Sequence, residues 1–141
     1  MRALLMLAVG AAMAVPTLAA AQEASILGRW RTASEGGVVE IHRCGQAICG
    51  RLVDAAALRA DPNQRDARNR NAALRDRPLR GLLVLRGFTG GPTRWTGGPL
   101  YDPESGQSAG SGTLTLSGDT LTVRGCIGPM LCRNQTWRRA R

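Results

Sequence analysis

The stretch TLTLSGDTLTVR, residues 113–124, decides the fold class. Two runs in it, residues 113–116 and 121–124, alternate a polar with an apolar side chain. This period of two is typical of a β-strand with one buried face. Between the runs, Gly118-Asp119 is a pair with glycine first, which favours a two-residue hairpin turn. The stretch therefore predicts an antiparallel β-hairpin.

Similar strand patterns, each bounded by glycine, proline or other turn residues, recur along the chain on both sides of this hairpin. They cover residues 26–32, 38–41, 48–53, 81–88, 95–101 and 134–139. Together with the hairpin they amount to roughly eight strands with short connections, a pattern typical of an all-β sandwich or barrel. We favour a single antiparallel β-barrel, because closure removes the exposed edges of a small sheet.

One connection is much longer than the others. Residues 54–80 are polar and hold seven arginines and four aspartates. We expect one or two short helical turns there, with Asp54 capping a turn at residues 55–58. Long connections in compact domains are commonly functional or mobile, so this segment is the first place to look for a site.

The first 21 residues have the pattern of a secretory signal peptide. Met1-Arg2 is a short basic start, residues 3–15 are apolar, and Ala19-Ala20-Ala21 is a small-residue cleavage site. The apolar run is shorter than the roughly 20 residues that span a bilayer. We expect cleavage after Ala21, a periplasmic or secreted protein without a membrane span, and one mature domain at residues 22–141.

The basic charge of the chain does not indicate a nucleic-acid partner. The formal net charge is +9, and all 19 basic residues are arginine. They are spread along the sequence, whereas nucleic-acid binders gather basic residues in one patch or stripe. The partners expected for a basic exported surface are anionic envelope polymers or lipid head groups.

The four cysteines, Cys44, Cys49, Cys126 and Cys132, are expected to form two disulfides. Their spacing is looser than that of common zinc ligands, C-x-x-C is absent, and an exported chain folds where disulfides persist. Four cysteines allow three pairings, and loop entropy alone would favour long-range links. The hairpin geometry favours Cys44–Cys49 and Cys126–Cys132. No metal or cofactor is expected, and the sole histidine, His42, is expected to face solvent from a strand.

A set of polar residues on or after the long connection is the candidate ligand-binding site. Its members are Asp66, Asn69, Asn71, Arg75, Arg77, Tyr101 and Asp102. In an extended segment Arg75 and Arg77 would face the same way and could clamp an anionic group of a small molecule. In the alternative interpretation, these arginines pair with nearby aspartates and pin the connection to the barrel.

Binding is favoured over catalysis, because no recognisable nucleophile–base pattern or phosphate-cradling glycine loop occurs. The leading hypothesis is an exported barrel whose mouth holds a small anionic molecule or an envelope component. One alternative is an enzyme that uses Asp66 or Asp102 with Arg75 and Arg77. The other alternative is a structural envelope factor without a ligand.

With these residues identified, the chain resembles the exported bacterial proteins grouped as domain of unknown function 2147. The resemblance covers the mature chain and rests on these residues: Gly28-Arg29-Trp30, Cys44, Cys49-Gly50, Asp66, Asn69, residues 75–81, Trp95, Gly97-Gly98, Tyr101-Asp102-Pro103 and residues 135–139. It implies a small lipocalin-like β-barrel and no particular activity. A looser similarity, to the lipocalins, implies a structural latch in which Trp30 on the first strand packs under Arg139 from the last.

Overall fold

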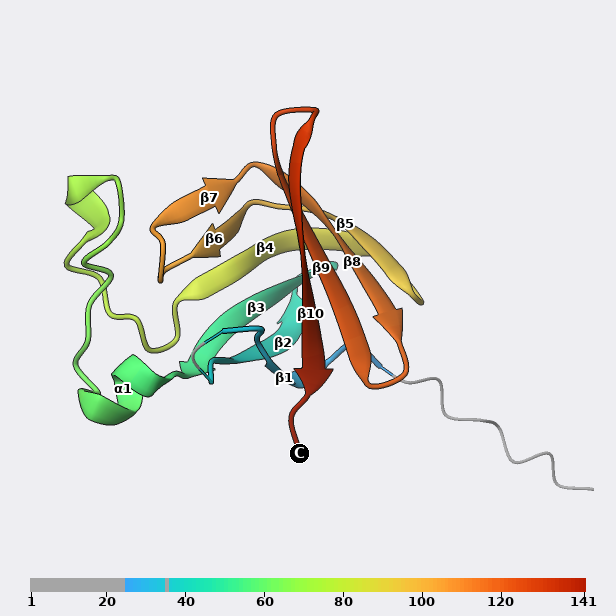
Figure 1. Cartoon of the computed structure of the whole chain (residues 1–141). Coiled ribbons are helices and arrows are strands. Elements are labelled where there is room, and N and C mark those ends of the chain that lie inside the picture. The colour runs from blue at the N-terminus through green and yellow to red at the C-terminus, as the bar shows by residue number, and fades with distance from the viewer. Residues whose placement is uncertain (1–24, 35) are drawn as a thin grey trace, which may run out of the picture.

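The computed structural model describes residues 25–34 and 36–141, and these form a closed, antiparallel β-barrel (Figure 1). The strands are β1 (Gly28–Arg31), β2 (Val38–Cys44), β3 (Ala47–Asp54), β4 (Leu83–Gly90), β5 (Arg94–Gly97), β6 (Leu100–Asp102), β7 (Gln107–Ala109), β8 (Ser111–Ser117), β9 (Thr120–Ile127) and β10 (Leu131–Arg139). They follow the order β3-β2-β1-β10-β9-β8-β5-β4-β6-β7, and a further pairing of β3 with β4 closes the ring. The predicted all-β barrel is confirmed.

The barrel has eight strand positions, because β5 with β6 and β7 with β8 each fill one position. Strand β4 pairs with β5 through Thr89 and Thr96, and with β6 through Leu85 and Leu100. The break between β5 and β6 falls at Gly97, where a Cβ atom would overlap the carbonyl oxygen of Gly87. Glycine therefore allows the strand to bend sharply while it stays paired with its neighbour.

The eight positions run up and down, so successive connections alternate between two ends of the barrel. We call the closed end the one that carries the tight turns at residues 45–46, 91–93 and 118–119; Ile26 and Trp30 are buried there. The open end carries the connections at residues 32–37, 55–82, 103–106 and 128–130. In Figure 1 the long connection lies at the left and the β9–β10 tip projects at the top.

The hairpin predicted from residues 113–124 is present as β8 and β9. Ser117 pairs with Thr120 around the two-residue turn, as expected. The apolar residues of both runs face the core and are buried, and the cluster that they join contains Trp30 and Phe88 at its centre. The local alternation of residue types thus sets which strand face is buried.

The long connection contains the two short helical turns that the sequence predicts, α1 (Ala56–Ala60) and the 3-10 turn η1 (Ala72–Leu74). The predicted cap at Asp54 is wrong. Asp54 is the last residue of β3, and α1 begins without a side-chain cap. The Asp54 carboxylate instead accepts a hydrogen bond from Nη1 of Arg59 at 2.8 Å. Leu58 is buried in the core and anchors α1 against the barrel.

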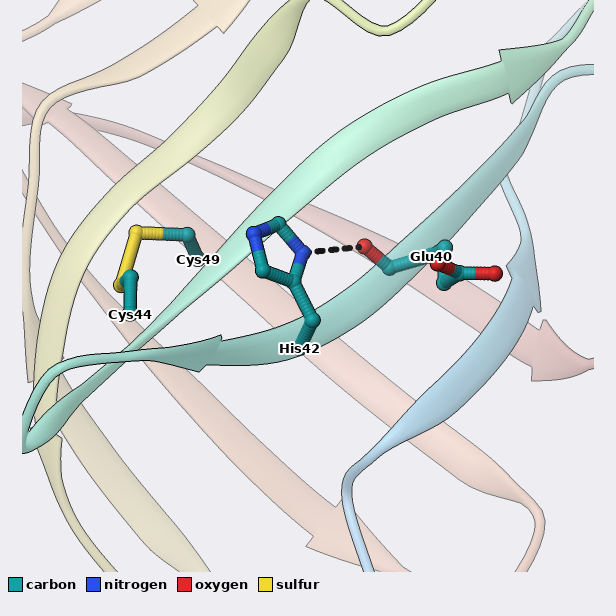
Figure 2. Close-up of a disulfide and its surroundings, with 4 residues drawn as sticks. All are labelled: Glu40, His42, Cys44 and Cys49. Atoms are coloured by element: carbon teal, nitrogen blue, oxygen red, sulfur yellow. Dashed lines mark hydrogen bonds between the residues drawn. A yellow bond between two sulfur atoms is a disulfide. The ribbon is translucent and has the colours of Figure 1, made fainter.

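Both expected disulfides are present, Cys44–Cys49 and Cys126–Cys132. The first links β2 to β3 near the closed end and the second links β9 to β10 near the open end. Figure 2 shows His42 beside the first disulfide, on the outer face of β2, with Nδ1 3.4 Å from the carbonyl oxygen of Glu40. Among the described residues no group of three or more potential ligands could hold a metal ion.

The described helices include none that is long and apolar enough to cross a bilayer. The predicted signal peptide, residues 1–21, lies outside the described residues. Two disulfides are compatible with a protein that folds in an oxidising, extracytoplasmic compartment.

Candidate functional site

The open end of the barrel leads into a cavity of about 560 Å³. Its deeper wall is apolar and comes from strands on all sides of the barrel: Val39, Leu52, Val84, Leu85, Leu100, Val123 and Trp137. Its rim is polar and comes from three of the open-end connections, at residues 32–37, 55–82 and 103–106, with Arg65 and Arg68 of the long connection and Glu104 of the β6–β7 turn among its residues. The cavity can therefore hold a molecule with one apolar and one polar part.

Strands β9 and β10 carry this change in polarity along their inner faces. From the closed end to the open end, the paired residues are Leu121 with Trp137, Val123 with Gln135, Gly125 with Arg133 and Ile127 with Leu131. The indole Nε1 of Trp137 donates a hydrogen bond to Oε1 of Gln135, the next inner-face residue toward the open end, at 3.0 Å. On this wall of the cavity, the amide of Gln135 and the guanidinium of Arg133 therefore lie between the apolar floor and the open end.

Arg133 pairs with Gly125 of β9, and Ala109 and Leu100 occupy the space above that glycine, where a Cβ atom would lie 3.2 Å from the Cβ of Ala109. The ion pairs found among the described residues include none made by Arg133. Its hydrogen-bond donors are therefore free of any described carboxylate and border the cavity. A guanidinium in this position is suited to bidentate binding of a carboxylate or phosphate.

A second polar cluster centres on Asp66 and fixes the long connection at the open end. The residue is buried, with 1% of its surface exposed. Its carboxylate accepts hydrogen bonds from the Tyr101 hydroxyl, from Nδ2 of Asn69 at 2.9 Å and from Nε of Arg77 at 2.8 Å. Three donors, one of them cationic, compensate the burial of this charge. We call Asp66, Asn69, Arg77 and Tyr101 the Asp66 network.

Within this network Tyr101 is held as a hydrogen-bond donor. Burial, and then the hydrogen bond to Asp66, raise the pKa of Tyr101 to about 12. The guanidinium of Arg77 lies over the Tyr101 ring at 5.2 Å from its centroid, and this charge lowers the pKa by a smaller amount. Tyr101 therefore joins β6 to the long connection through its hydrogen bond to the Asp66 carboxylate, which is also paired with Arg77.

The arginine clamp expected at Arg75 and Arg77 rests on an extended segment that the structure does not contain. Arg75 follows the 3-10 turn η1 and has helical backbone angles, φ −68° and ψ −21°. Its Nε donates to the carbonyl oxygen of Asn69 at 2.8 Å, while Arg77 is paired with Asp66. The predicted extended segment is therefore wrong, and the two guanidiniums have different partners.

Asp102, predicted as part of the same site, lies outside the Asp66 network. Its carboxylate accepts hydrogen bonds from the backbone N–H of Glu104 at 3.0 Å and from the Ser105 hydroxyl at 2.7 Å. It thus organises the β6–β7 turn, as aspartate commonly does. Asn71 similarly caps η1, since its side chain accepts from the Ala73 N–H at 3.1 Å.

The β6–β7 turn and the long connection pack closely against each other. Nη1 of Arg68 donates to the carbonyl oxygen of Glu104 at 2.6 Å. Gly106 has φ +72°, and a Cβ atom there would overlap the carbonyl oxygen of Arg68. This contact and the Asp66 network together shape the rim of the cavity.

Arg133 and Gln135 are absent from the predicted site, although the sequence carries a signal for Gln135. Residues two apart on a strand share a face. The same rule that relates Arg139 to Trp137 also places Gln135 and Arg133 on the inner face, toward the open end. The strand predicted at residues 134–139 contains Gln135 but not Arg133; the structure extends this strand to Leu131 and so places Arg133 on it.

At the closed end, Arg139 covers the ring of Trp30. Trp30 is fully buried, and Cζ of Arg139 lies 4.2 Å from its ring centroid. The guanidinium donates to the carbonyl oxygens of Leu27 at 3.1 Å and Ser25 at 2.6 Å, and the Trp30 indole donates to that of Ile26 at 2.8 Å. This geometry is the one expected of the latch residues.

Comparisons with known proteins agree with this architecture. A solved structure, protein HP1028 from the human pathogen Helicobacter pylori, which is described as belonging to the lipocalin family, is similar with a TM-score of 0.70 and 17% sequence identity. The match covers 83% of this chain and 84% of that one, and at this identity it supports the fold alone. A search of curated protein sequences finds no match.

The sequence itself matches one family model, described as "Uncharacterized protein conserved in bacteria (DUF2147)", over residues 28–139. These limits coincide with the first residue of β1 and the last residue of β10. Because the match spans every strand of the described barrel, the chain belongs to the DUF2147 family of bacterial proteins.

Proposed function

We propose that this barrel binds a small amphiphilic molecule, with its apolar part in the cavity and an anionic group at Arg133. The observation that carries the proposal is the inner wall of β10, where Trp137, Gln135 and Arg133 pass from apolar to cationic along one cavity. The cavity, about 560 Å³, is within the range of about 300–1,000 Å³ common for small-molecule pockets.

In this proposal the Asp66 network positions the mouth and does not contact the anionic group. Arg77 is already paired with the buried Asp66, and removing it would leave that carboxylate without its cation. Arg75 holds the backbone of the long connection through Asn69. Of the three arginines that line the cavity, Arg65 and Arg68 donate to the backbone carbonyl oxygens of Asp76 and Glu104. Arg133 forms no ion pair with a described carboxylate, so the anionic group is assigned to it.

The geometry gives little support to the enzyme alternative that uses Asp66 or Asp102. The Asp66 carboxylate accepts from three donors, and its side chain is 0% exposed. Asp102 is occupied with the β6–β7 turn. Asp66 does not line the cavity, and Asp102 lines it with its carboxylate bonded to the Glu104 N–H and the Ser105 hydroxyl, so binding is the function that this site supports better.

The test compares two charge-neutralising variants, Arg133→Gln and Arg124→Gln. Arg124 lies on the outer face of β9, one strand from Arg133, so its variant changes the net charge equally and leaves the cavity intact. The probe is a dansylated undecanoic acid, titrated by fluorescence, with its methyl ester as the neutral analogue. We expect Arg133→Gln to weaken binding of the acid about tenfold, the loss of roughly 1.4 kcal/mol, and to leave binding of the ester unchanged.

Two results would contradict the proposal. One is equal binding of the acid by Arg133→Gln and the unchanged protein. The other is an equal loss in Arg124→Gln, which would mean that net charge attracts the probe without a site. Native mass spectrometry of protein recovered from its own cells would then identify any molecule that remains bound.

Export of the protein is part of the same proposal. The basic start, the apolar run and the small-residue site support it, together with the two disulfides. N-terminal sequencing of the protein from the periplasmic fraction should begin at Gln22. An N-terminus that retains Met1 in the mature protein would refute the cleavage.

A further inference from the structure

The tip of the β9–β10 hairpin, residues 127–131, concentrates exposed apolar surface at the mouth of the barrel. Met130 is 93% exposed, Leu131 65% and Ile127 51%. Among the described residues the one other exposed large hydrophobic side chain is Leu74, at 38%. Exposed apolar side chains that gather in one place commonly mark an interaction surface.

The tip is held as a projecting hairpin. The Cys126–Cys132 disulfide links its two strands at its base, and Ile127 pairs with Leu131 just beyond the link. Figure 1 shows this hairpin extending past the other strands at the top of the barrel. The three apolar side chains are thus presented to solvent on a cross-linked support.

We infer that this tip docks the barrel onto the surface of an anionic lipid bilayer. Apolar side chains on a short projecting hairpin can enter the boundary between head groups and acyl chains, while nearby arginines face lipid phosphates. Arg65 and Arg68 lie on the rim of the same mouth, whereas Arg133 lies inside it. The chain as a whole carries a net charge of +9, which complements an anionic membrane.

This inference goes beyond the proposed ligand binding, and it gives the cavity an orientation. Ile127 and Leu131 line the cavity as well as the exposed tip. Docking through the tip therefore turns the mouth of the cavity toward the bilayer. An amphiphile could then pass between membrane and cavity without crossing much water.

The chain offers a direct probe of the tip, because Met130 is its one methionine after residue 21. All strands of the barrel lie within residues 28–139, so protein that begins at Gln22 contains the whole fold and lacks the apolar segment before it. With a carbon-13 label on the methionine methyl group, its resonance reports Met130. We expect vesicles of phosphatidylglycerol and phosphatidylethanolamine that carry a nitroxide on the acyl chain to broaden this resonance, and phosphatidylcholine vesicles to do so much less.

Co-sedimentation with the same anionic vesicles gives the second readout. The double variant Met130→Ser with Leu131→Ser removes apolar surface without a change of charge, and we expect it to bind at least tenfold more weakly. Leu74→Ser is the matched control, since it removes exposed apolar surface elsewhere, and it should bind as the unchanged protein does.

Three outcomes would overturn the inference. The Met130 resonance could remain sharp while the protein sediments with vesicles, which would indicate binding by charge alone. The tip variant and Leu74→Ser could lose binding equally. Alternatively, the protein could ignore vesicles and form a dimer in analytical ultracentrifugation that the tip variant abolishes, which would identify a second copy as the partner.

Discussion

Each end of the barrel holds an arginine over an aromatic ring, but the two arginines have different partners. At the closed end, Arg139 lies 4.2 Å from the Trp30 ring centroid, donates to backbone carbonyl oxygens and forms a 3.5 Å ion pair with the exposed Asp119. At the open end, Arg77 lies 5.2 Å from the Tyr101 ring centroid and pairs with the buried carboxylate of Asp66. The first arrangement needs no buried anion, whereas the second depends on one.

The difference follows from the backbone at each end. Trp30 and Arg139 are paired residues of β1 and β10, so the sheet ladder already aligns them. Asp66 lies in the long connection, which has only the isolated bridge between Arg65 and Pro78 near it. Hydrogen bonds and ion pairs between side chains therefore fix the backbone at the open end, whereas strand pairing fixes it at the closed end. We expect closed-end residues to control unfolding of the whole barrel and open-end residues to control detachment of the long connection.

The largest effect is expected for Trp30→Ala. The side chain is fully buried in the core at the closed end. Truncation of a large aromatic in such a position costs about 3–5 kcal/mol of unfolding free energy. Urea denaturation followed by circular dichroism would measure it. A loss below about 1 kcal/mol would show that the closed end does not control the barrel.

The Trp30–Arg139 contact can be isolated with a double-mutant cycle. Arg139→Ala should also destabilise the barrel, and the combined loss should be smaller than the sum of the single losses, because the two side chains touch. Arg138→Ala is the matched control, since Arg138 is the exposed neighbour on β10. Additive losses for Trp30 and Arg139 would refute the latch.

The next largest effect is expected at the open end, for Arg77→Gln. This change leaves the buried Asp66 carboxylate without its cation, and breaking such a pair costs about 3 kcal/mol when one partner remains buried. Arg77 itself is only 26% exposed at the side chain. The control Arg75→Gln removes a hydrogen bond to a backbone carbonyl oxygen and should cost about 1 kcal/mol.

Hydrogen exchange distinguishes local from global loss in the Arg77 variant. The amide of Asp66, bonded to the Arg77 carbonyl oxygen, and that of Leu79, bonded to the Gln64 carbonyl oxygen, both report attachment of the long connection. We expect both to exchange faster while amides of β9 keep their protection. Equal acceleration in β9 would mean that the open end and the barrel unfold together.

The fold could be predicted from the sequence because its signals are local. The alternation at residues 113–116 and 121–124, the turn residues between strands and the cysteines that flank tight turns all act within a few positions. Each of these features correctly indicated a hairpin or a link. The number of strands and their short connections left a sandwich or a barrel open, and the barrel was favoured because closure removes exposed edges.

The candidate site could be predicted only in part, because its contacts are not local. The donors to Asp66 include Arg77 and Tyr101, which lie 11 and 35 positions away. Composition indicated that arginines and aspartates of this region would meet, but the path of the connection decides which ones do. The 3-10 turn before Arg75 replaces the extended segment that the predicted clamp requires, and Asp54 pairs with Arg59 instead of capping α1.

Removal of the disulfides gives a smaller effect, and it should differ between the ends. Short cross-linked loops contribute about 2 kcal/mol each by restricting the unfolded chain. Cys44→Ser with Cys49→Ser should approach this loss in urea denaturation. Cys126→Ser with Cys132→Ser should lose less, because the exposed tip gains freedom in the folded state too. A larger loss at the tip would contradict the greater local freedom assigned to the open end.

The smallest effect concerns the single tyrosine. Tyr101→Phe removes one donor from Asp66 and leaves Asn69 and Arg77 in place. We expect a loss of about 1.5 kcal/mol, typical of a hydrogen bond to a charged group. Since the chain contains one tyrosine and no lysine, side chains other than Tyr101 contribute little to titration between pH 10 and 12.

The sign of the pH dependence follows from the direction of the Tyr101 shift. The ordinary pKa of tyrosine is about 10, and in the folded barrel burial and Asp66 raise it to about 12. The folded state therefore holds this proton more tightly than the unfolded state does. The resulting stability is complete below pH 10 and is lost as the pH rises toward 12. Tyrosinate absorbance after rapid pH jumps should titrate near 12 in the folded protein. A midpoint near 10 would show that the Asp66 network is open to water. The network would then not fix the open end of the barrel as strand pairing fixes the closed end.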